Sequence, residues 1–213
     1  MLTISSQNKP LLRCVAPFAP YLTVGIGLLV LHNVWAAIFS YHLVMLLIMV
    51  VSGQGLPISQ LWKGGDRLRF PLLTVAGASG GFLLWLLQPW VLVNGELAAF
   101  AQSIGLTQQS WPFFIVYFVL FTPALEELYW RNYLGNLTLK PQVNDFLFAG
   151  YHLIVLAGII QISWLIFIFF LLAATAWCWR QSNRLGGGLL SSFTSHLAVD
   201  ISIILAAYFL IIH

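Results

Sequence analysis

Charged side chains are scarce in this chain. Of its 213 residues only nine are lysine or arginine and six are aspartate or glutamate, so charged residues make up 7% of the sequence. A soluble domain typically carries about 25% charged residues. The net charge of +3 is modest and no run of basic residues occurs, which argues against a nucleic-acid-binding surface. The scarcity of charge therefore excludes an ordinary soluble domain and indicates no nucleic-acid partner.

Cysteine is also scarce. Cys14 and Cys178 are the only two cysteines, and they lie far apart in the sequence without a CxxC spacing. This pattern supports neither a disulfide nor a thiol redox motif. We expect both to be buried thiols that act as small apolar side chains.

Apolar residues, by contrast, are abundant. They make up 60% of the chain, and the mean hydropathy is +0.91. A helix needs about 20 apolar residues to cross a bilayer, so the chain is long enough for six to eight crossings and leaves no room for a separate soluble domain. We predict an all-α, polytopic transmembrane helix bundle. It would form a single membrane domain over residues 1–213, with lipid around it; the sequence indicates no oligomeric state.

The hydrophobic runs predict about seven spans. The connection 94–110 between the third and fourth spans has apolar residues at helical spacing and predicts a short helix on the surface. The fifth span is the shortest. The expected spans cover residues 11–31, 34–52, 71–93, 111–134, 145–160, 162–180 and 186–212.

The cations predict the orientation of these spans. With the N-terminus inside and seven crossings, every lysine and arginine falls on the inner side, as the positive-inside rule requires. Glu96 then lies on the outer side, and the C-terminus is outside. The inner cations are Lys9, Arg13, Lys63, Arg67, Arg69, Arg131, Lys140, Arg180 and Arg184.

Ionisable residues also occur within the apolar spans. Glu126 and Glu127 are adjacent in FTPALEELYWRNYL, His152 follows in the next span, and His196 and Asp200 lie four residues apart in the last. A charged group at bilayer depth costs a few kcal/mol or more. At 1.5 Å per residue, Glu126, His152 and His196 all lie about 10–15 Å from the inner face. The shared depth predicts one polar site near the cytoplasmic face.

Helix geometry refines the arrangement around the glutamates. Glu127 and Arg131 are i,i+4 neighbours that can pair on one face, whereas Glu126 points about 100° away and can face a cavity. Thr122 and Pro123 precede them, and this proline is expected to kink the span or to begin a half-helix. Taken singly, each of these polar groups could serve only to tie helices together. Their convergence at one depth favours a functional site.

Glutamate and histidine at such a site suit hydrolysis. A carboxylate can take a proton from water while a histidine orients or shares it, and a second histidine can stabilise an oxyanion. A zinc site is the alternative, with His152, His196 and Glu126 as its ligands. The sequence contains no HExxH motif, and the residues alone do not decide between the two. We predict metal-free hydrolysis, because using Glu126 as a ligand would consume the only obvious base.

Three short motifs in this region resemble those of a known family. EELYWR (126–131) resembles an EExxxR motif, FAGYH (148–152) an FxxxH motif and HLAVD (196–200) an HxxxN/D motif. Their order and spacing are similar to those of the CPBP intramembrane proteases, also called the Abi family, which include the type II CAAX prenyl endopeptidases. The resemblance spans residues 122–200.

The resemblance implies an all-helical intramembrane endopeptidase that cuts a membrane-proximal peptide, with its protease core at about 111–212. It also implies a role for each motif residue. Glu126 would be the base with Glu127 and Arg131 beside it, His152 would help to activate water, and His196 with Asp200 would form the oxyanion-binding side.

The chain also departs from the family pattern. Trp130 stands where phenylalanine is usual, Asn132 where glycine is usual, and Asp200 is the less common choice over asparagine. An ionised Asp200 would repel an oxyanion, so we expect it to be protonated or paired with His196.

The competing hypothesis is a non-catalytic membrane protein. It could be a peptide-binding or immunity protein that uses the same pocket, or a transporter-like carrier. A carrier is expected to have repeated halves with broken helices in both. No repeat occurs in this sequence, and the ionisable residues of the constellation all lie in its C-terminal half, which favours the enzyme.

Overall fold

The structure is a computed structural model that describes residues 8–65, 67–93 and 97–212. Within these ranges the chain is all-α and contains no β-strand, as the sequence predicts. The N-terminal helices are α1 (Asn8–Val15), η1 (Ala16–Phe18), α2 (Ala19–Gly25), η2 (Ile26–Val30), α3 (Val34–Val51) and η3 (Ile58–Trp62). The remaining helices are α4 (Arg69–Val91), α5 (Leu97–Ser103), α6 (Trp111–Glu126), η4 (Glu127–Tyr133), α7 (Val143–Leu156), α8 (Ile162–Gly186) and α9 (Leu190–Ile212).

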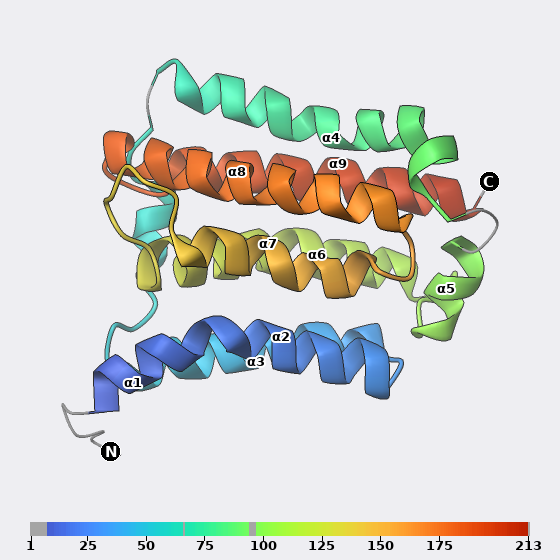
Figure 1. Cartoon of the computed structure of the whole chain (residues 1–213), viewed down its shortest axis with the longest axis horizontal. Coiled ribbons are helices and arrows are strands. Elements are labelled where there is room, and N and C mark those ends of the chain that lie inside the picture. Colours follow the sequence, from blue (N-terminus) through green and yellow to red (C-terminus); the bar gives the residue numbers. More distant parts are fainter. Residues whose placement is uncertain (1–7, 66, 94–96, 213) are drawn as a thin grey trace.

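The long helices run side by side along one direction (Figure 1). α4 lies at one edge of the bundle, α2 and α3 lie at the other, and α6 to α9 lie between them. α9 packs against α4, α6 and α8, while α7 packs against α2 and α8. The elements that carry the predicted site, α6, η4, α7 and α9, therefore lie inside the bundle and are shielded by the flanking helices.

Six helical stretches of the described chain are long and apolar enough to cross a membrane. They cover Leu11–Val30, Val34–Val51, Arg69–Val91, Trp111–Tyr133, Ile162–Gly186 and Leu190–Ile212. The expected fifth span, 145–160, is instead the 14-residue helix α7, which is shorter than a bilayer-spanning helix of about 20 residues. The turn after α7 extends it: Val93 N donates to Ile159 O, and Gln161 N to Val91 O, both over 2.9 Å. The segment thus still reaches the far end of α4.

The helix ends that carry cations meet at one end of the bundle, at the left of Figure 1. Leu190 N donates to Lys63 O over 3.0 Å, and Arg13 donates to Gly135 O over 3.3 Å, so chain segments far apart in sequence are joined there. Arg13 and Arg180 both contact the loop that follows η4, and the one-sided distribution of all nine cations stays a prediction. Glu96 and the side chain of Lys9 lie outside the described residues. Which side of the membrane this end faces stays a prediction.

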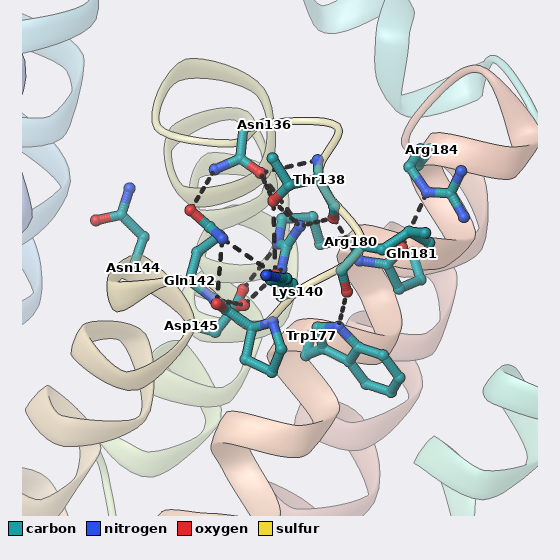
Figure 2. A network of polar contacts seen from close by, with 12 residues as sticks. Asn136, Thr138, Lys140, Gln142, Asn144, Asp145, Trp177, Arg180, Gln181 and Arg184 are labelled. Carbon is teal, nitrogen blue, oxygen red and sulfur yellow. Dashed lines mark hydrogen bonds and ion pairs between the residues drawn. The ribbon is translucent and has the colours of Figure 1, made fainter.

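Arg180 joins several chain segments at this end of the bundle and forms a buried ion pair, drawn in Figure 2. Its Nε and Nη2 atoms donate to the two carboxylate oxygens of Asp145 over 3.1 and 2.8 Å. Nη2 also donates to Lys140 O, and Nη1 to Thr138 O. Asp145 in turn accepts from the backbone N–H of Gln142 and caps α7. One arginine thus joins the end of α8, the 134–142 loop and the start of α7.

Two glycines let α4 approach α9 closely. A Cβ atom on Gly77 would lie 2.4 Å from Ser195 O, and one on Gly81 would lie 2.0 Å from Ser202 O. Both distances are too short for any side chain, so the small-residue pattern of this span serves close helix packing. Gly81 N also donates to Ser202 Oγ over 3.0 Å. α9, which carries His196, is thereby held in a fixed register on α4.

One expectation from the sequence needs correction. Cys14 and Cys178 are free thiols, but both are exposed on the protein surface rather than buried. The short helix α5 forms within 94–110, as predicted, and it is anchored to the bundle. Ala101 is buried, and Ile104 O accepts a hydrogen bond from Val34 N over 2.8 Å.

Candidate active site

The predicted site begins where the fourth span changes its helical pitch. α6 ends at Glu126, and Glu127–Tyr133 continue as the π-helix η4. Pro123 lies inside α6 without interrupting it, so the expected half-helix is not seen. The change in pitch follows at Glu127, one turn after Pro123. At this junction the N–H of Glu127 is shared between Pro123 O and Ala124 O. Single π-turns inside α-helices frequently occur at functional sites.

Glu126 is held by two tyrosines. Its Oε1 atom accepts a hydrogen bond from Tyr41 OH on α3 over 3.0 Å and a second from Tyr151 OH on α7. Its Oε2 atom lies 3.6 Å from Nε2 of His196 on α9, and no described residue donates a hydrogen bond to it. The side chain is 1% exposed. Glu126 therefore has one oxygen fixed by tyrosines, while the other accepts no hydrogen bond from a described residue.

Glu127 turns toward His196 as well. Its Oε1 atom accepts a hydrogen bond from Nδ1 of His196 over 3.0 Å and lies 3.7 Å from Nε of Arg131. The expected Glu127–Arg131 pair is present, but the shorter contact is with the histidine. Because an ionised carboxylate only accepts, Nδ1 carries a hydrogen, and Nε2 of His196 faces Glu126 and Asp200, the latter at 3.7 Å.

Arg131 is buried rather than placed at the membrane boundary. Its guanidinium lies 3.9 Å from the ring centroid of Phe148 and 5.0 Å from that of Trp179. A cation over aromatic faces is stabilised by the ring quadrupoles. Trp179 also stacks on His196, with ring centroids 4.7 Å apart. The aromatic rings thus hold the arginine and the imidazole next to Glu127.

His152 is connected to Glu126 through the hydroxyl of Tyr151. Its Nδ1 atom bonds Phe148 O over 2.8 Å, and its Nε2 atom bonds Tyr151 OH over 3.2 Å. Tyr151 OH in turn contacts Glu126. The structure therefore brings Glu126, Glu127, Arg131, His196 and Asp200 into direct contact, and connects His152 to them by one hydroxyl. This arrangement agrees with the shared depth expected from the sequence.

The site concentrates negative charge. Glu126, Glu127 and Asp200 are all buried, and among the described contacts the only ion pair of these carboxylates with a permanently charged cation is that of Glu127 with Arg131. Buried charges are stable only when they are paired, so His196, which lies between the three carboxylates, is the residue placed to balance them. Access for a substrate requires the covering side chains to move, and the expected opening of a cavity toward the inner face stays a prediction.

Sequence reasoning missed the hydrogen-bond donors to Glu126. Tyr151 lies inside FAGYH, directly before His152, and Tyr41 lies in the second span, 85 residues before its partner. Trp130, noted above as a departure from the family pattern, donates from Nε1 to Tyr41 OH over 3.2 Å and stacks on Tyr151. Trp130, as a departure from the pattern that this region resembles, was the one signal in the sequence that pointed to this hydrogen-bonded group.

In the described part of the chain, no group of three or more His, Cys, Asp or Glu side chains is arranged to hold a metal ion. Of the three zinc ligands considered from the sequence, His152 has both ring nitrogens in hydrogen bonds to protein atoms. Hydrolysis without a metal stays a prediction.

Comparison with family models, with curated proteins and with solved structures finds no match to this chain.

Proposed function

We propose that this protein is an intramembrane endopeptidase that hydrolyses a membrane-proximal peptide bond with water activated by Glu126. The observation that carries the proposal is the buried Glu126 carboxylate, which has its free Oε2 atom 3.6 Å from Nε2 of His196. The motif resemblance to CPBP proteases points to the same reaction and the same residues. The proposed substrate is the tail or leader of a membrane-associated or lipidated protein.

Glu126 acts as the general base in this scheme. A water molecule hydrogen-bonded to Oε2 gives up a proton to the carboxylate as its oxygen adds to the peptide carbonyl. The two tyrosines on Oε1 keep the carboxylate in one orientation. The proton later passes to the nitrogen of the leaving amine when the C–N bond breaks. Positioned groups of this kind typically contribute about 10²–10⁴-fold to a rate.

His196 stabilises the negative charge that develops on the carbonyl oxygen of the substrate in this scheme. Glu127 holds Nδ1 of the imidazole, so that Nε2 is directed at the space shared by Glu126 and Asp200. A protonated Nε2 donates to the oxyanion of the tetrahedral intermediate, and preorganised donors of this kind stabilise it strongly. Asp200 shares a proton with His196 in this scheme and so does not repel the oxyanion. Arg131 provides a positive charge beside the Glu127 carboxylate, 3.7 Å from its Oε1 atom.

A non-catalytic peptide-binding protein is the second candidate. The near-complete burial of Glu126 and Glu127, which are 1% and 0% exposed, favours it, because a closed polar network can simply specify helix packing. The two candidates differ in whether any peptide is cleaved.

The test is mass spectrometry of candidate tail peptides, with and without a prenyl group, incubated with purified protein in detergent and in H₂¹⁸O. We expect cleavage that places one ¹⁸O atom in the new C-terminal carboxylate. Activity should survive exhaustive chelation, in keeping with the metal-free prediction. Binding without cleavage over the whole set favours the second candidate. Cleavage that is lost on chelation and restored by zinc would contradict the metal-free scheme.

A further inference from the structure

The hydroxyl of Tyr151 lies between two acceptors. It contacts Oε1 of Glu126 on α6 and lies 3.2 Å from Nε2 of His152 on its own helix. Phe148 O can only accept, so the 2.8 Å contact with it requires a hydrogen on Nδ1 of His152. In a neutral imidazole the other nitrogen, Nε2, then has a lone pair and accepts. Oε1 of Glu126 and Nε2 of His152 are therefore both acceptors for the single hydrogen of the Tyr151 hydroxyl.

Tyr41 provides a contrast at the same glutamate oxygen. Its hydroxyl donates to Glu126 and accepts from Nε1 of Trp130, an indole that can only donate. The Tyr41 hydroxyl also interacts with the hydroxyl of Tyr151. Of the two hydroxyls on Oε1 of Glu126, that of Tyr151 is the one with a described contact to His152.

We propose that Tyr151 is a switchable donor that couples the protonation of Glu126 to the hydrogen bonding of His152. When Glu126 is ionised, the carboxylate is the stronger acceptor and takes the hydrogen, because bonds to charged acceptors are roughly twice as strong. When Glu126 has taken up a proton, its Oε1 atom accepts weakly and the hydroxyl turns to Nε2 of His152. The hydroxyl only rotates, and no covalent bond is made or broken.

The switch gives the buried network a satisfied arrangement in both protonation states of Glu126. Leaving a buried polar group unpaired is unfavourable, so an alternative partner for Tyr151 eases both the uptake of a proton from water and its return. The charged and titratable groups that act on His152 from other elements are Glu126 on α6, Arg131 on η4 and His196 on α9. This role for His152 rests on the proposed function, whereas the coupling itself does not require catalysis.

The test is ¹⁵N NMR of histidine-labelled protein, with the His152 signals assigned by subtraction in His152→Gln. Glu126→Gln replaces the carboxylate by a neutral, weaker acceptor and imitates the protonated state. We expect it to move the Nε2 resonance of His152 in the direction of a stronger hydrogen bond. The same substitution in a Tyr151→Phe background should produce no such movement.

Tyr41→Phe is the matched control, because it removes the other hydroxyl on Oε1 of Glu126 but no contact with His152. In that background the response to Glu126→Gln should persist. A response that survives in Tyr151→Phe, or one that is absent from the parent protein, would overturn the proposal. Because these spectra need no substrate, a protein that cleaves no peptide but shows the coupling contradicts the proposed function alone.

Discussion

Nδ1 of His196 donates a hydrogen bond to Oε1 of Glu127 over 3.0 Å, between two side chains that are 3% and 0% exposed. This contact joins α9 to η4 across the centre of the bundle. It fixes the imidazole with Nε2 toward Glu126, and it also gives Glu127 a partner besides Arg131. Oε2 of each glutamate accepts no hydrogen bond from a described residue, so the two glutamates differ in the partners of Oε1, which are tyrosines for Glu126 and His196 for Glu127.

Substitution of Glu127 should destabilise the protein. Glu127→Ala leaves the buried Arg131 without its carboxylate and His196 without its acceptor, and breaking a buried pair in this way costs about 3–5 kcal/mol. We expect a clear fall in the thermal unfolding midpoint in detergent, followed by tryptophan fluorescence. Glu127→Gln keeps an acceptor for His196, so it should lower the unfolding midpoint less than Glu127→Ala does. Equal midpoints for the parent and the alanine variant would show that the pair does not support the fold.

Periodicity and residue chemistry were enough to locate the polar site, but not its hydrogen bonds. The spacing of Glu126, His152 and His196 from the inner ends of their spans predicted a common depth, because rise per residue is nearly constant in any α-helix. The π-helix after Glu126 could not be predicted in that way, since it departs from the 3.6-residue period on which the argument rests. Glu127, the first residue of this π-helix, contacts His196 as well as Arg131.

Long-range pairs were hidden for a different reason. Asp145 and Arg180 lie 35 residues apart, and Tyr41 lies 85 residues before Glu126. No local pattern marks such partners, because they are set by which helix faces meet in the folded bundle. Close packing at Gly77 and Gly81 was predictable, since a four-residue spacing of glycine has a direct steric meaning.

The ion pair between Arg180 and Asp145 should be important for stability. Arg180→Ala leaves Asp145 buried and unpaired and removes the donors to the 134–142 loop, at a cost of about 3–5 kcal/mol. We expect a lower unfolding midpoint and faster proteolysis within that loop. Arg184→Ala is the control on the same helix, because Arg184 bonds only the side chain of Gln181 among the contacts described. If the two variants have the same unfolding midpoint and the same rate of proteolysis, the Arg180–Asp145 pair does not contribute specifically to stability.

Adjacent glycines of α4 should respond in opposite ways to alanine. A Cβ atom at Gly81 would meet Ser202 O at 2.0 Å, whereas one at Gly80 would find its nearest neighbour at 3.5 Å. Gly81→Ala should therefore destabilise the α4–α9 contact by about 1–3 kcal/mol or more. Gly80→Ala should be neutral or stabilising by up to about 1 kcal/mol through helix propensity. Unfolding midpoints of the two variants give the comparison, and a similar loss for both would refute the close-packing argument.

The path of α7 through the bundle predicts an odd number of crossings. The six long helices together with the shorter α7 place the connection 53–70 and the C-terminus at opposite ends of the molecule. Reporter fusions within 53–70 and after residue 213 should report opposite sides of the membrane, with the 53–70 fusion inside because it carries cations. Detection of both reporters on one side would contradict this topology.

The most direct test of the proposed chemistry is the rate of peptide cleavage by Glu126→Gln. This substitution keeps the size of the side chain and an acceptor for the tyrosines, but it removes the base. We predict a loss of about 10²–10⁴-fold in kcat, with an unfolding midpoint close to that of the parent protein. His32→Gln, at an exposed turn residue outside the site, should keep full activity. A Glu126→Gln variant that folds normally and cleaves peptide at the parental rate would contradict the central claim.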